Sequence, residues 1–154
     1  MTRCCDTSTE DNDAAKIAAR KKSDLKNRLM TMSDYPDAVF VSVHLNKFTT
    51  SSASGSQVFY SGKGEESKQL GDCIQKCIIK QLQPYNDRVN KKATSSTYLL
   101  YNATVPAVLV ECGFLSNKQE LELLKTEEYQ KQMAFSIYCG INNYFSKVSE
   151  TKET

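Results

Sequence analysis

The chain has 154 residues, a length that suits one domain able to bury roughly two-thirds of its unfolded surface. Its 20 basic and 18 acidic residues leave a formal net charge of only +2, without the strongly basic balance of a nucleic-acid binder. The mean hydropathy is −0.50, and no apolar run approaches the ~18 residues that a membrane-spanning helix needs. These values exclude a nucleic-acid partner and a membrane span.

The first residues of the chain and its cysteines restrict the predicted function further. Residues 1–15 lack the basic start and apolar stretch of a secretory signal, so no signal peptide is predicted in this chain. Of the six cysteines, four lie in apolar segments and are predicted to pack as small hydrophobes, namely Cys73, Cys77, Cys112 and Cys139. Cys4 and Cys5 are vicinal and open to oxidation. No CxxC pair exists, which argues against a cysteine zinc site.

The first half of the chain predicts two helices and two strands. Apolar residues keep helical spacing from Ala14 to about Met32, and Pro36 ends that pattern. The run AVFVSV is short, β-branched and apolar, as in a strand buried on both faces. In chain order, we expect a polar loop at 4–13, a helix at 14–32, a break at 33–37, a strand at 38–43, a loop at 49–54, a strand at 57–60 and a helix at 65–82.

The second half predicts two more strands and two more helices. The run AVLVE predicts a buried strand, and Ser116 with Gln119 fits a capping box at the start of a short helix. The apolar stripe from Tyr129 to Val148 is the strongest helical pattern in the sequence. We expect a loop at 84–96, strands at 98–101 and 107–111, helices at 116–124 and 126–148, and a frayed tail at 149–154.

Alternating apolar strands and helices predict an α/β domain whose sheet is largely parallel. In such sheets, functional groups gather at the carboxyl ends of strands. His44, the only histidine, follows one predicted strand, and Glu111 ends another. Each has a plain structural alternative, because a histidine often bonds a backbone carbonyl and a buried carboxylate often has a partner. A carboxylate ending an apolar strand is costly unless it is paired or used, and burial raises its pKa towards that of a general base.

Two blocks around these residues resemble the amidase-3 family of zinc-dependent N-acetylmuramoyl-L-alanine amidases, which degrade peptidoglycan. Residues 41–46 (VSVHLN) are similar to the family's SIHxN segment, and residues 105–117 (VPAVLVECGFLSN) to its PAxLVExGFxSN block. Residues 2–6 (TRxxD), Arg20 and residues 25–28 also resemble segments of this family. Residues 54–63 and 98–102 are similar to segments of the CwlD-type amidases, which act on spore cortex.

The resemblance implies a mixed, mostly parallel sheet flanked by helices on both faces. It implies that His44 is one zinc ligand and that Glu111 is the catalytic carboxylate. Asn46 and the loop at 88–92 are candidate substrate contacts, and each is equally well a solvated surface group. Residues 1–148 would form the catalytic domain. The family's GHGG segment, its second zinc ligand and its first strand have no counterpart in the sequence, so the domain is expected to be incomplete at its N-terminus.

Two alternatives remain open beside the amidase. One is a metal-deficient remnant or peptidoglycan-binding module of the same fold, because catalytic zinc normally takes three protein ligands. The other is a zinc amidohydrolase that cleaves a different amide. The resemblance implies action outside the cytoplasm, at the cell wall or spore envelope. A sheet without its first strand would expose an edge, which predicts a homo-oligomer or an accessory protein as partner.

Overall fold

The computed structural model describes residues 17–152, with side chains described for residues 19–150. Their elements are α1 (Ile17–Ser33), β1 (Phe40–Asn46), β2 (Gln57–Tyr60), α2 (Glu65–Gln81), β3 (Lys91–Lys92), α3 (Tyr98–Asn102), β4 (Ala107–Phe114), α4 (Lys118–Leu124) and α5 (Glu127–Lys152). The polar loop predicted at 4–13, the TRxxD-like segment at 2–6 and the Cys4–Cys5 pair lie outside the described residues.

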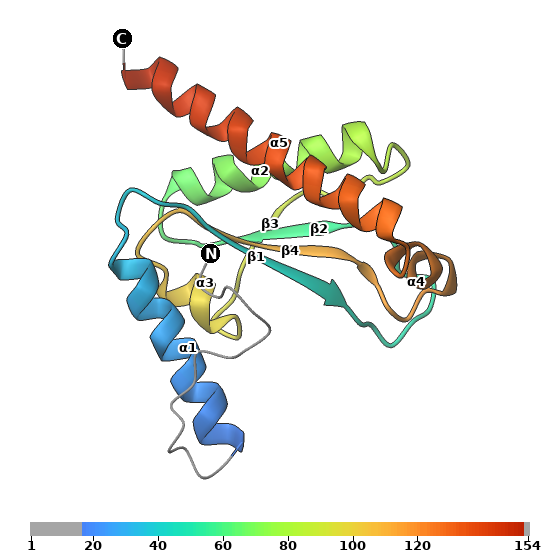
Figure 1. Ribbon diagram of the computed structural model, residues 1–154, viewed down its shortest axis with the longest axis horizontal. Helices are drawn as coiled ribbons and strands as arrows, with labels where there is room; N and C mark the ends of the chain where they lie inside the picture. Colours follow the sequence, from blue (N-terminus) through green and yellow to red (C-terminus); the bar gives the residue numbers. More distant parts are fainter. Residues whose placement is uncertain (1–16, 153–154) are drawn as a thin grey trace.

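The four strands form one mixed sheet in the order β1-β4-β2-β3. Strand β1 runs parallel to β4, and β2 runs parallel to β3, whereas β2 and β4 are antiparallel. Helices α2 and α5 lie on one side of the sheet, and α1 and α3 lie on the other (Figure 1). The predicted α/β fold, with a mostly parallel sheet flanked on both faces, is confirmed.

The larger core lies between the sheet and the α2–α5 layer. Alternate residues of β4 point into it, and Val108 and Val110 are fully buried there. From α2, Leu70, Ile74 and Ile78 fill the same core. The two helices approach closely, because a Cβ placed on Gly140 of α5 would lie 2.5 Å from the Ile74 Cα.

The opposite face of the sheet carries a smaller core near one end. Met32 of α1 and Leu100 of α3 pack there with Ala107, against the partly buried Phe40 and Leu109. The buried members of this cluster stop short of the later residues of β1 and β4. The face of the sheet beyond them is the place where the polar residues of β1 and β4 gather.

The segment predicted as a strand at 98–101 is instead the short helix α3, so that prediction was wrong. A run of four apolar or aromatic residues does not distinguish a strand from a buried helical turn. The tertiary context decides, because Leu100 is fully buried against α1 and the sheet. Strand β3 was missed for the converse reason: its two exposed lysines have no apolar pattern, and only pairing with β2 makes them a strand.

Several element ends also differ from the predictions. Strand β1 includes His44 and ends at Asn46, and β4 continues past Glu111 to Phe114. Helix α4 is capped by Asn117, whose side chain accepts from the N–H groups of Gln119 and Glu120, rather than by a capping box at Ser116. Helix α5 continues to Lys152, so residues 149–152 are helical and not a frayed tail. Within residues 17–152, no helix is long and apolar enough to cross a membrane.

Candidate active site on the open face of the sheet

Three polar side chains form a row across the middle of the sheet. His44 of β1 is in register with Glu111 of β4, and Gln57 of β2 is in register with the same Glu111 on the other side. Residues in register on neighbouring strands point to the same face and lie about 5 Å apart. Val110 and Cys112 face the α2–α5 core, so Glu111 and its two neighbours face the opposite side. The two residues that the sequence singled out are therefore brought together.

His44 is held by its own strand. Its Nε2 lies 2.8 Å from the Ser42 hydroxyl, two residues earlier on the same face. When Nε2–H donates to that hydroxyl, Nδ1 keeps its lone pair. Burial lowers the pKa of His44 below its ordinary value, and the positive charge of Arg28 on α1 lowers it further. The imidazole is thus neutral at neutral pH, which is the form that binds a metal.

Glu111 carries one carboxylate oxygen that is left unsatisfied by the described part of the chain. Its Oε2 is buried and accepts no hydrogen bond from any described residue. Desolvation by burial raises the pKa of Glu111 above its ordinary value. An unsatisfied buried polar atom is costly, so such a group indicates a ligand, a water or a proton-transfer role. The geometry suits Glu111 to accept a proton at Oε2.

Asn46 ends β1, where the pairing with β4 becomes irregular between His44 and Asn46. Its backbone carbonyl accepts from Leu115 N–H at 2.8 Å, which ties the end of β1 to the end of β4. The substrate contact predicted for its side chain stays a prediction. Asn46 lies two residues beyond His44 on the same strand and pairs with Phe114, so it is at the end of β1 that lies beyond the His44–Glu111 pair.

Gln57 and Arg88 belong to the site, although the sequence did not single out Gln57. The Gln57 Oε1 accepts from Arg88 Nη1 at 3.2 Å, and its Nε2 donates to the Val89 carbonyl. The Arg88 Nε also donates to the Ser54 carbonyl at 2.7 Å. The sequence offered one indication, a polar side chain at the start of an otherwise apolar strand. The structure shows that Gln57 is buried, and a buried amide needs polar partners.

Glu120 holds together the strands that carry Gln57 and Glu111, and the sequence did not single it out. Its carboxylate accepts from Gly55 N–H at 2.6 Å and from Phe114 N–H at 2.7 Å. Gly55 lies two residues before Gln57, and Phe114 lies three residues after Glu111, so Glu120 ties the two site strands together. The side chain is only 5% exposed. Its position in an amphipathic helix just after the GFLSN segment gave no indication of burial.

A zinc site is incomplete among the described residues. They contain no group of three histidine, cysteine or acidic side chains placed to hold a metal ion. His44 could offer one nitrogen to a metal, and the Glu111 oxygen that lacks a described partner suits a base beside a metal-bound water better than a structural ion pair. Catalytic zinc normally takes three protein ligands. The residues of the described chain alone therefore do not fit a full zinc set.

The structure is an α/β domain with an imidazole and a desolvated carboxylate in register on one face of its sheet, a combination of side chains that hydrolases use. The comparison with protein families specifies it. The family model described as N-acetylmuramoyl-L-alanine amidase matches residues 2–143. The chain belongs to this N-acetylmuramoyl-L-alanine amidase family.

Individual relatives agree with the family. The chain is 35% identical over 153 residues to the germination-specific N-acetylmuramoyl-L-alanine amidase of Bacillus subtilis, covering 99% of this chain and 64% of that protein. It is similar to the CwlD amidase of Clostridioides difficile, solved in complex with the GerS lipoprotein, with a TM-score of 0.88, 39% identity, and coverage of 94% of this chain and 74% of that one. An N-acetylmuramoyl-L-alanine amidase of Clostridium difficile 630 has a TM-score of 0.71 at 29% identity, over 79% of this chain and 65% of that one. The chain thus spans a little under two-thirds of the Bacillus relative.

Proposed function

We propose that this chain is part of a zinc-dependent N-acetylmuramoyl-L-alanine amidase, which hydrolyses the amide between muramic acid and L-alanine in peptidoglycan of the cell wall or spore cortex. The observation that carries the proposal is the pairing of His44 with Glu111 in register on one open face. His44 would be one zinc ligand, and Asn46 would contact the substrate at the rim. The other metal ligands would come from outside the described residues.

Glu111 is the proposed proton carrier. Its pKa is raised by burial, so the carboxylate is a stronger base than an exposed one and its acid form persists closer to neutral pH. Oε2 would take a proton from the attacking water and return it to the departing amine of L-alanine. Gln57, bonded to the loop at Arg88 and Val89, fixes the wall of the site beside Glu111. Zinc, when bound, supplies Lewis-acid activation of the water and carbonyl.

A second candidate function is supported by the incomplete metal set. With one histidine in the chain and no described three-ligand group, the same fold would bind peptidoglycan without cleaving it. A different amide substrate for a zinc enzyme of this fold is the remaining alternative, and the match to the amidase family argues against it.

The test is to supply the purified chain with zinc and an N-acetylmuramoyl tripeptide, and to follow the free tripeptide by mass spectrometry. Hydrolysis that falls by about 10²- to 10⁴-fold in Glu111→Gln supports the amidase. Glu122→Gln, on the outer side of α4, is the matched control and should retain the wild-type rate. Binding without hydrolysis and without tightly held zinc supports the second candidate. Full activity in Glu111→Gln would remove Glu111 from the mechanism.

The proposed place of action is outside the cytoplasm, at the wall or spore envelope, because the proposed substrate, peptidoglycan, lies there; the germination-specific name of the Bacillus subtilis relative supports this. An accessory protein is part of the proposal, because the CwlD amidase was solved with the GerS lipoprotein. A groove beside β1 supports it: the exposed Val43 and Leu45 line it together with Met133 and Ile137 of α5. A second copy of the chain could cover the same groove in a homo-oligomer. The mass of the purified protein in solution distinguishes a homo-oligomer from a monomer that awaits an accessory protein.

A further inference from the structure

Arg88 is a cation that several contacts hold in place, and none of its described partners is negatively charged. Its Nε donates to Ser54 O at 2.7 Å and its Nη1 donates to Gln57 Oε1 at 3.2 Å. The guanidinium carbon lies 5.0 Å from the centre of the Phe114 ring, which it stacks against. The Asn86 side chain accepts from the Arg88 backbone N–H at 3.0 Å. Both the side chain and the loop that carries it are therefore fixed in place.

No carboxylate neutralises this cation within the part of the chain whose side chains are described. The ion pairs there join other residues, as when Arg28 meets Asp24 at 2.9 Å. Arg88 bonds only to neutral acceptors, a carbonyl and an amide oxygen. Lys91 adds charge nearby, because it is in register with Phe59 on the face that carries Gln57. Among the residues whose side chains are described, no acceptor bonds Nη2 and no carboxylate forms an ion pair with Arg88, and a preorganised guanidinium of this kind is suited to bind an anion.

We propose that Arg88 binds a carboxylate of the peptide stem, namely the α-carboxylate of the residue that follows L-alanine. The inference rests on the proposed amidase substrate and adds a specificity-determining residue to it. Arg88 recognises an acidic stem and disfavours one in which that carboxylate is amidated. The planar fork of the guanidinium matches a carboxylate, whereas a carboxamide offers one oxygen and no charge.

The spacing across the sheet agrees with this assignment. Glu111 and Gln57 lie on neighbouring strands, which are about 4.8 Å apart. The Arg88 guanidinium donates a hydrogen bond to the Gln57 side-chain amide. Peptide backbone extends by about 3.3–3.6 Å per residue. A scissile amide above Glu111 therefore places the second residue of the stem roughly 7 Å away, and a stem that crosses from β4 towards β2 runs in the direction of Gln57 and of Arg88, which is bonded to Gln57.

The experiment compares two soluble ligands that differ only at this group. They are N-acetylmuramoyl tripeptides with either D-glutamate or D-isoglutamine after L-alanine, so one carries the α-carboxylate and the other its carboxamide. Their Kd values are measured by NMR titration in the presence of a chelator, so that no turnover occurs. Wild-type protein should bind the acidic ligand about 10-fold more tightly, the size expected for one partly exposed charge-assisted pair.

The variants are Arg88→Gln, Arg88→Lys and, as a charge-matched control, Lys92→Gln. Lys92 is in register with Tyr60, so it lies on the opposite face of the sheet although it is in the same segment. Arg88→Gln should abolish the preference, Arg88→Lys should keep part of it, and Lys92→Gln should keep it whole. Amide spectra of each variant check the fold, and Arg88→Lys retains a cation if Arg88→Gln unfolds.

Two outcomes would overturn this inference and leave the proposed function standing. One is equal binding of both ligands to the wild type. The other is a preference for the acidic ligand that is undiminished in both Arg88→Gln and Arg88→Lys. Failure of wild type to bind either ligand is a different result, because it contradicts the proposed substrate and this inference with it.

Discussion

Replacing the buried Glu120 by glutamine should destabilise the domain and loosen the site at once. Its carboxylate accepts two backbone N–H groups, from Gly55 at 2.6 Å and from Phe114 at 2.7 Å, and it is 5% exposed. In Glu120→Gln, the amide oxygen can serve one of these donors, and the NH₂ group then faces the other. A lost charge-assisted hydrogen bond and an unsatisfied buried donor together cost about 3 kcal/mol. For a domain of this size, that lowers Tm by about 6–12 °C.

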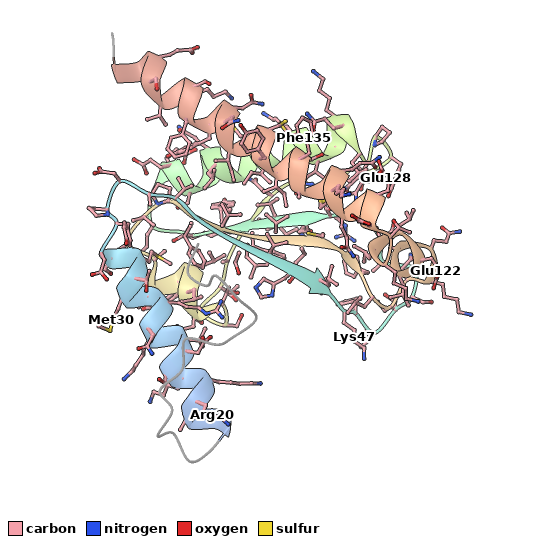
Figure 2. The ribbon with its side chains drawn as sticks, viewed as in Figure 1. Arg20, Met30, Lys47, Glu122, Glu128 and Phe135 are labelled. Carbon is pink, nitrogen blue, oxygen red and sulfur yellow. The ribbon has the colours of Figure 1, made fainter. Side chains whose placement is uncertain are left out.

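The matched control is the same substitution two residues away. Glu122 points outward from α4 (Figure 2), where its ion pair with Lys125 spans 2.8 Å between side chains that are 72% and 58% exposed. Glu122→Gln should change the unfolding free energy by no more than about 0.5 kcal/mol. Urea unfolding measures both variants, and amide NMR shifts of Gly55 and Phe114 report the local change. Equal midpoints for the two variants would refute the role given to Glu120.

The pH dependence of Glu111 and the steric limit at Gly140 give two further predictions. Burial raises the pKa of Glu111 in the folded state above its ordinary value of 4.5. The free energy of unfolding of the wild type, relative to that of Glu111→Gln, should therefore fall as the pH rises from about 4.5 through the folded-state pKa, and then level off. Urea midpoints of the two proteins that run parallel between pH 4 and 8 would contradict this. Gly140→Ala should destabilise by about 2 kcal/mol despite better helix propensity, because its Cβ would lie 2.5 Å from the Ile74 Cα. Gly71→Ala is the matched control, because a Cβ at Gly71 would lie 3.0 Å from the side-chain amide of Asn90, which can move. Its free energy of unfolding should stay within about 1 kcal/mol of the wild-type value. Similar losses of unfolding free energy in the two variants would show that crowding at Ile74 is not the cause.

The sequence predicted the elements whose pattern is long or strongly apolar. Helix α2 was predicted to end one residue later than it does, and β2 was predicted with its observed bounds. Cys73, Cys77 and Cys112 are buried free thiols and Cys139 is half-buried, as their apolar neighbours indicated. Local patterns suffice here because one face of each element is buried along its whole length.

Short elements and ends were not predictable in the same way. Helix α3 and strand β3 have few residues, so their state depends on partners distant in sequence: Met32 for Leu100, and β2 for the two lysines. The extension of β4 past Glu111 likewise involves partners distant in sequence, because Phe114 pairs with Asn46 and its N–H donates to Glu120. Propensity is too weak to decide such cases without tertiary contacts.

The α/β fold, the family and the two candidate catalytic residues, His44 and Glu111, were predictable from the sequence, because strand ends and motif blocks are local in the chain. The folded chain was needed to show that these residues are neighbours in register and that Glu111 Oε2 has no partner among the described residues. It was also needed to show that Gln57 lies in register with Glu111, that Arg88 bonds Gln57 and that Glu120 joins the two strands. Register, burial and charge pairing are properties of segments brought together from different parts of the chain, so they appear only when the sheet is assembled.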